Sequence, residues 1–236
     1  MLVGISALDE FLLQRKNAKD LEKGKQDMKR ESKGKIRNTY KVGKIRCVIG
    51  FDQSYSRTGI SIAVDGKLKK VTSVKLVNVK SKSAKRLLVE QKCRSAIEAC
   101  LKKFPPDEIV VLVERIRTFT AGNDLRPEML KGHGALISRI VDTAYQYGIE
   151  TYSVDTRAWK SRVLGTSKPV FEPLEGVENP QKFGSVRKAI KLGFGEQMKV
   201  KSCKTRSFRY DDDMADAICI SLYGFSGYPY TLSLEQ

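Results

Sequence analysis

The sequence has little histidine and no paired cysteine motif. It contains one histidine, His133, so a zinc site built on several histidines is excluded. Its five cysteines are odd in number and form no CxxC pair, which indicates reduced thiols in a cytosolic protein and not a disulfide framework. If the protein binds a metal, oxygen ligands must hold it, and such ligands favour magnesium or manganese.

Long apolar runs are also missing. No stretch of about 18 or more consecutive apolar residues occurs, so the sequence predicts no transmembrane helix. The N-terminal segment MLVGISALDEFLLQRK lacks a leading basic region, and Asp9 and Glu10 interrupt its apolar part, which argues against a signal peptide. We therefore expect a cytoplasmic protein.

Acidic residues are the minority among the charged residues. Lysine and arginine total 44 against 27 aspartate and glutamate, which gives a formal net charge of +17. Such an excess favours a polyanionic partner, and nucleic acid is the default. Charge that serves only solubility is the alternative, but the clustering of basic residues described below argues against it. An anionic membrane is a weaker option.

The chain divides by composition into an arm and a folded domain. Residues 1–43 begin with a short apolar segment and continue as a basic stretch with almost no apolar residues. This composition predicts a basic helical or flexible N-terminal arm, although a solvated tail without a function fits it as well. We expect a single folded domain over residues 44–236, because one substantial core fits this length.

Five strands are predicted in the domain. Residues 45–52, 59–66 and 67–80 predict three consecutive antiparallel strands, with a hairpin turn at Asp65-Gly66. The continuous apolar run EIVVLVE, residues 108–114, is typical of a central parallel strand, and IETYSV predicts the fifth strand. Apolar residues at helical spacing predict helices over 89–104 and 133–144, a further helix near 185–192, and a last helix that begins with DDDMADA. The fold class is therefore α/β, a mixed five-stranded sheet flanked by helices.

Four carboxylates are expected to meet at one edge of this sheet. Asp52 ends the first strand and Glu114 ends the fourth, while Asp213 and Asp216 share one face of the last helix. An unpaired charge at the end of a core strand costs several kcal/mol unless a partner or a metal neutralises it. Two Mg²⁺ ions about 4 Å apart would neutralise the four acids, and this is the arrangement that cleaves phosphodiesters.

Simpler roles exist for some of these acids. Aspartates at a helix start favour the positive end of the helix dipole and cap free N–H groups, and we assign this role, or solvent exposure, to Asp211 and Asp212. Glu114 could pair instead with Arg115 or Arg117, but this pairing would leave its position at the strand end unexplained.

Three segments together carry a family resemblance. IGFDQSYSRTG, VLVERIRTF and DDDMADAICIS, in this order and spacing, resemble the RNase H-like superfamily and, within it, the RuvC-type Holliday-junction resolvases. In that family an Asp precedes a turn ending in Thr-Gly, here Thr58 and Gly59, a Glu ends the fourth strand, and an Asp stands three residues before an Asp-Ala pair. VDTRAWKSRVLGT is also similar to the strand-helix segment of the family.

The resemblance implies a fold, an activity and a set of catalytic residues. It implies an RNase H-like fold and a homodimer that resolves four-way DNA junctions by paired symmetric nicks. It implies that Asp52, Glu114, Asp213 and Asp216 are catalytic and hold two Mg²⁺ ions, for which Mn²⁺ can substitute. A longer loop over residues 166–181 and the extra arm depart from short bacterial members and fit a phage-like or divergent member.

Basic and aromatic residues flank the predicted acidic centre. They are candidates for DNA contacts, since phosphates attract a basic rim around a metal site. Phe119 could wedge between bases, as the resemblance also implies, or it could anchor a core. The candidates are Arg117, Phe119, Lys160, Arg162, Lys201, Lys204, Arg206 and Arg209.

Two rival functions fit the same residues. The first is another RNase H-like nuclease that acts on branched DNA or on RNA–DNA hybrid. The second is a non-catalytic DNA-binding protein on the same fold. The complete acidic set argues against the second, because without a metal those charges only repel DNA.

Overall fold

The computed structural model describes residues 45–115, 127–168, 172–201, 208–226 and 231–232. All of them belong to the unit Tyr40–Gln236. The predicted arm, residues 1–43, lies outside the described residues, so the division into an arm and a domain stays a prediction. No helix in the described ranges is both long and apolar enough to cross a membrane.

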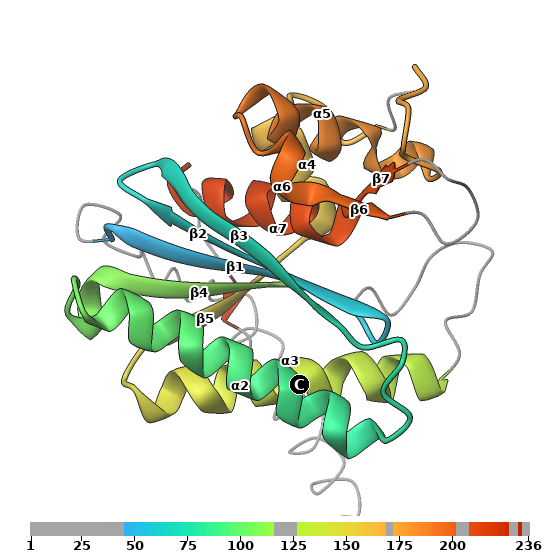
Figure 1. Ribbon diagram of the computed structural model, residues 1–236. Coiled ribbons are helices and arrows are strands. Elements are labelled where there is room, and N and C mark those ends of the chain that lie inside the picture. Colours follow the sequence, from blue (N-terminus) through green and yellow to red (C-terminus); the bar gives the residue numbers. More distant parts are fainter. Residues whose placement is uncertain (1–44, 116–126, 169–171, 202–207, 227–230, 233–236) are drawn as a thin grey trace, which may run out of the picture. The chain divides into compact units, whose positions relative to one another are not determined.

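A mixed β-sheet forms the centre of the described domain (Figure 1). Its strands are β1 (Cys47–Gln53), β2 (Arg57–Val64), β3 (Lys67–Lys75), β4 (Ile109–Glu114), β5 (Glu150–Val154) and β8 (Thr231–Leu232). They lie in the order β3-β2-β1-β4-β5-β8. The first three strands pair antiparallel, while β4 pairs parallel with both β1 and β5. The predicted five-stranded mixed sheet is therefore confirmed, and β8 adds a short antiparallel strand at its edge.

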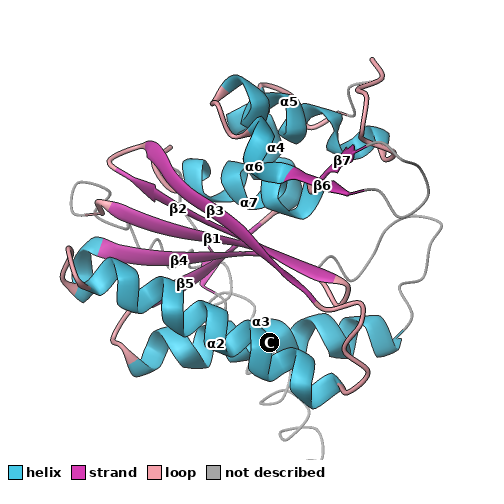
Figure 2. Cartoon of the chain, viewed as in Figure 1, coloured by secondary structure: helices cyan, strands magenta, loops and turns pink. Residues whose placement is uncertain are grey.

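Helices cover both faces of the sheet (Figure 2). On one face lie α2 (Lys82–Leu101) and α3 (Pro127–Gln146). On the other lie α7 (Asp212–Tyr223) and the shorter helices α4 (Thr156–Leu164), α5 (Phe183–Lys191) and α6 (Gly195–Met198). Successive side chains of β1 point to opposite faces of the sheet, so the domain has a hydrophobic core on each face. Ile49 and Phe51 pack toward α2 and α3, while Val48 packs toward α7.

Several element boundaries differ from the prediction. The third strand was expected to reach residue 80 but ends at Lys75, because Ser81 caps α2 and the chain must leave the sheet to reach it. Helix α3 begins at Pro127, six residues before the predicted start, and Pro is favoured at such a first position. The basic stretch before α7 contains two short antiparallel strands, β6 (Lys199–Lys201) and β7 (Phe208–Tyr210), which were not predicted.

The hairpin turn and the cysteines agree with the sequence. Asp65 and Gly66 both have positive φ angles, of 48° and 74°, as a two-residue hairpin turn requires. The cysteines within the described ranges are buried free thiols, and Cys203 lies outside those ranges. These thiols are Cys47, Cys93, Cys100 and Cys219.

Helix α7 lies very close to the sheet because two glycines face it. A Cβ atom on Gly50 would lie 2.6 Å from the backbone nitrogen of Ser221, and one on Gly59 would lie 2.0 Å from the backbone oxygen of Asp213. Both contacts are too short for any side chain. The hydroxyl of Ser61 also donates to the backbone oxygen of Ala217 over 2.6 Å. The sheet therefore fixes the depth of α7, including its first turn.

Candidate active site

Strands β1 and β4 deliver two carboxylates to the same edge of the sheet. Their parallel register runs through the pair Phe51 and Val113, so Asp52 and Glu114 follow as the next residues of adjacent strands. The side chain of Asp52 is buried, and that of Glu114 is half-buried. This is the convergence that the sequence predicted for these two residues.

Helix α7 brings the other two predicted acids to this edge. Asp213 and Asp216 lie one turn apart on the helix, and Gly59 allows the first turn to approach β2. Asp216 is only 2% exposed. Its Oδ1 atom is buried and accepts no hydrogen bond from any described residue. A buried carboxylate oxygen without a donor is costly, and a metal ion would satisfy it.

A lysine that the sequence analysis did not single out lies among these acids. Lys182 ends a short 3₁₀ helix, Pro180–Lys182, that precedes α5. Its Nζ atom lies 2.5 Å from Oδ2 of Asp216, 3.3 Å from Oδ2 of Asp52 and 4.0 Å from Oδ1 of Asp213. One ammonium thus neutralises part of the charge of three carboxylates, and a negative excess remains when all three are ionised.

The protonation of this cluster follows from burial and mutual charge. Burial raises the pKa of Asp52 well above its ordinary range, Lys182 opposes this, and the charge of Glu114 adds to it. Burial likewise raises the pKa of Asp213 to about 7, again against the effect of Lys182. For Lys182 itself burial lowers the pKa, but the charges of Asp216 and Asp52 outweigh burial and hold the pKa well above its ordinary value. Added positive charge would ionise the acids fully, so the donor set fits divalent cations.

Two side chains hold Glu114 from outside the acidic cluster. The indole Nε1–H of Trp159 donates to Oε1 of Glu114 over 3.1 Å. The side-chain amide of Gln53 pairs with the backbone of Glu114, since its Nε2 donates to the backbone oxygen over 2.6 Å and its Oε1 accepts from the backbone nitrogen over 3.3 Å. Sequence reasoning identified neither partner, and the ring of Trp159 is fully buried in the core.

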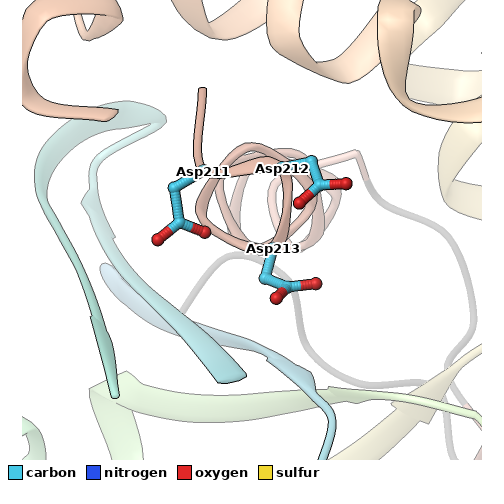
Figure 3. A group of neighbouring side chains, drawn as sticks. All are labelled: Asp211, Asp212 and Asp213. Atoms are coloured by element: carbon cyan, nitrogen blue, oxygen red, sulfur yellow. The ribbon is translucent and has the colours of Figure 1, made fainter. Parts of the chain in front are cut away.

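The acidic triplet at the start of α7 includes the N-cap of that helix. Oxygens of Asp211, Asp212 and Asp213 all lie within 4.8 Å of one another, yet the three side chains spread around the first turn, with Asp211 and Asp212 on opposite sides (Figure 3). Asp211 is the N-cap, because it accepts from the backbone nitrogen of Met214 over 3.2 Å. The expected capping role of Asp211 is therefore confirmed.

Asp211 is also tied to the sheet. Its Oδ2 atom accepts from Nη1 of Arg57 over 2.6 Å and from the hydroxyl of Ser73 over 2.7 Å. With both oxygens occupied and only 1% of the residue exposed, Asp211 has no free atom for a metal. It holds the first turn of α7, and hence Asp213, against strands β2 and β3.

The predicted DNA contacts are only partly within the described residues. Lys160 lies at the site, where its Nζ donates to the backbone oxygen of Gln181 over 3.2 Å and lies 5.3 Å from the ring centre of Trp159. Arg162 is exposed on α4, and Lys201 and Arg209 are exposed on β6 and β7. The remaining candidates lie outside the described residues. They are Arg117, Phe119, Lys204 and Arg206.

Comparison with known proteins gives a structural match without a sequence match. No protein-family model and no curated protein matches the sequence. The RuvC of Thermus thermophilus, in a complex with a Holliday junction substrate, matches with a TM-score of 0.56 and 16% identity over 79% of this chain and 99% of RuvC. The chain has the RuvC fold. A second structure of Thermus thermophilus RuvC matches with a TM-score of 0.53 and 14% identity over the same shares, 79% and 99%.

A further similar structure is the yeast mitochondrial Holliday junction resolvase Ydc2, with a TM-score of 0.44 and 17% identity over 78% of this chain and 79% of Ydc2. The predicted RNase H-like fold and the resemblance to RuvC are confirmed at the level of the fold. At these identities the likeness extends to the RuvC architecture, and the activity rests on the site.

Proposed function

We propose that this protein is a metal-dependent, structure-selective endonuclease that resolves four-way DNA junctions as a homodimer. The observation that carries the proposal is the meeting of four carboxylates at one edge of a RuvC-fold sheet, with a buried oxygen of Asp216 that no described donor satisfies. The net charge of +17 favours a nucleic acid as the partner. The Thermus thermophilus relative in complex with a Holliday junction supports the choice of a branched DNA.

Each acidic residue has a role in this proposal. Asp52, Glu114, Asp213 and Asp216 would hold two Mg²⁺ ions, for which Mn²⁺ could substitute. When bound, such ions activate the attacking water and stabilise the leaving 3′ oxygen. Asp52 and Asp216 supply ligands fixed by their burial, and Asp211 holds the helix turn that carries Asp213.

Lys182 would act beside the metal ligands. Its raised pKa keeps the ammonium charged at neutral pH, so it brings positive charge to the place where a scissile phosphate must lie. Basic residues at the rim, including Lys160, would contact phosphates away from the cut. These contacts would fix the orientation of the DNA without reading its sequence.

The symmetry of the substrate is the reason to propose a dimer. A four-way junction has two equivalent strands, and its resolution needs one nick in each. One chain carries one acidic set, so a two-fold dimer supplies two sites with the symmetry of the junction. A supercoiled plasmid that extrudes a cruciform tests this arrangement, because paired nicks in one binding event linearise it. Accumulation of nicked circles alone would contradict paired cutting.

The substrate class is tested by parallel cleavage assays. The purified protein is incubated with Mg²⁺ and a four-way junction, a fork, a linear duplex or an RNA–DNA hybrid. We expect preferential cleavage of the junction, loss of cleavage with Asp52→Asn, and near-normal cleavage with the matched control Asp212→Asn. Equal cleavage of linear duplex or hybrid would favour a general RNase H-like nuclease. Tight junction binding without any cleavage would favour the non-catalytic DNA-binding protein.

A further inference from the structure

Glu114 lies just beyond the last residue of β4 whose backbone pairs with β1. The parallel ladder between β1 and β4 ends with the pair Phe51 and Val113, one residue before Glu114. On its other side Glu114 still pairs with Val154 of β5. A strand end held on one side alone leaves the carboxylate free to change its direction, which would weaken a metal ligand.

The side chain of Gln53 replaces the missing backbone pair. Its amide donates to the backbone oxygen of Glu114 over 2.6 Å and accepts from the backbone nitrogen over 3.3 Å. A carboxamide carries one acceptor and a donor in the same arrangement as a peptide group, so it extends the ladder by one residue. Gln53 is buried, which shields both hydrogen bonds from water.

Trp159 fixes the carboxylate itself. Its ring is fully buried against α7 and the sheet, and its Nε1–H has one possible use, as a donor. The acceptor is Oε1 of Glu114, 3.1 Å away. Helix α4, which carries Trp159, is anchored in turn by its N-cap Asp155, which accepts from the backbone nitrogens of Arg157 and Ala158. Among the described residues, no side chain or backbone group donates a hydrogen bond to Oε2 of Glu114.

We propose that Gln53 and Trp159 are positioning residues that hold Glu114 in its metal-binding orientation before the metal arrives. The inference rests on the proposed function, because it assumes that Glu114 binds a divalent cation. Residues that hold a metal ligand in place in this way change metal affinity by about 10- to 100-fold when they are replaced. In the alternative hypothesis, Glu114 serves only as the acceptor for the buried indole N–H of Trp159. Replacing Trp159 would then lower the stability of the protein and leave its metal affinity unchanged.

The single tryptophan provides a direct spectroscopic test. In ¹H–¹⁵N spectra of the full chain, one indole signal reports the hydrogen bond to Glu114. We expect Glu114→Gln to move this signal in the metal-free protein, and we expect Mg²⁺ to move it in the wild type along a saturable curve. An indole signal that ignores saturating Mg²⁺, or that ignores Glu114→Gln, would overturn the proposal.

Substitutions test the effect on affinity. Trp159→Phe keeps the ring volume without the N–H, and Gln53→Met keeps the chain length without the amide. We expect each to weaken Mn²⁺ binding, measured by calorimetry, by about 10-fold or more. We also expect a rise in the Mg²⁺ concentration needed for half-maximal cleavage, while cleavage at saturating metal recovers. The control Ile97→Val, on the buried face of α2, should lose stability and keep its metal affinity.

The outcomes separate the two hypotheses. In a Glu114→Gln background, Trp159→Phe should weaken Mn²⁺ binding no further, because its only route to the metal is gone. Unchanged Mn²⁺ affinity in Trp159→Phe and Gln53→Met, with wild-type cleavage intact, would overturn the positioning role alone. A wild type that neither binds Mn²⁺ nor cuts DNA would overturn the proposed function and this inference together.

Discussion

Replacing Lys182 by methionine should destabilise the metal-free protein and strengthen its response to metal. The ammonium neutralises Asp52 and Asp216, which are nearly fully buried, and lies close to Asp213. Removing one partner from a buried ion pair costs about 3–5 kcal/mol, because a buried charge is left without compensation. We expect the lower end, about 3 kcal/mol, since the carboxylates can take up protons instead. For a domain of this size, that corresponds to a melting temperature about 6–12 °C lower.

The loss of stability in Lys182→Met should increase as the pH rises. The pKa of Asp213 is about 7 in the folded protein against an ordinary value of 3.8, so the folded state binds this proton more tightly than the unfolded state. The stability of the metal-free protein should therefore fall as pH rises from about 4 to about 7. Because Lys182 lowers the pKa of Asp213, Lys182→Met should raise this pKa further and extend the pH range over which stability falls. The stability difference between Lys182→Met and the wild type should therefore be largest at pH 8.

Thermal unfolding with and without Mg²⁺ measures both the loss of stability and the response to metal. Divalent ions would replace the missing positive charge, so Mg²⁺ should raise the melting temperature of Lys182→Met by more than that of the wild type. Lys188→Met is the matched control, because Lys188 lies on the adjacent helix α5 without an ion pair among the described residues. Equal losses for the two variants, or a loss that does not change between pH 5 and pH 8, would refute the reasoning.

Four further substitutions probe the elements that carry the acids. Gly59→Ala should displace the first turn of α7 and lower the cleavage rate by about 100-fold. Gly50→Ala, which crowds the same helix farther along, should lower thermal stability with a smaller loss of cleavage. Asp216→Asn should abolish Mg²⁺-dependent cleavage in gel assays and leave junction binding intact or tighter; residual cutting near the wild-type rate would remove Asp216 from the site. Arg57→Met leaves Asp211 buried without its counter-charge and should cost about 3 kcal/mol in urea denaturation, and an unchanged midpoint would show that this pair contributes nothing.

Much of the fold could be predicted because local patterns agree with the tertiary structure. The alternation in β2, the apolar run of β4 and the Asp65-Gly66 turn each specify their element within a few residues. The positions of Asp52 and Glu114 followed in turn, since adjacent parallel strands end at the same edge of the sheet. Helical spacing alone was enough to relate Asp213 to Asp216.

The partners of these acids could not be predicted, because they depend on contacts between distant segments. Lys182 is one of 44 basic residues, and its neighbourhood in the sequence is an ordinary loop before a helix. Gln53 resembles any polar residue at the end of a strand until the register of β4 places the backbone of Glu114 beside it. The size of Trp159 is typical of a core residue, and only the direction of its N–H reveals a second role.

The residues of the site are far apart in the sequence, and this distance determines when the site can form during synthesis. Lys182 and Asp52 are 130 positions apart, and Arg57 and Asp211 are 154 apart. Strands β1 and β2 leave the ribosome early, whereas α7 emerges only after strands β1 to β5 and the other described helices, so no partial chain that ends before α7 contains the four acids together. A growing polypeptide that lacks α7 therefore carries Asp52 and Glu114 without their partners. On the proposed function, metal-dependent cleavage would therefore begin only when the domain is nearly complete.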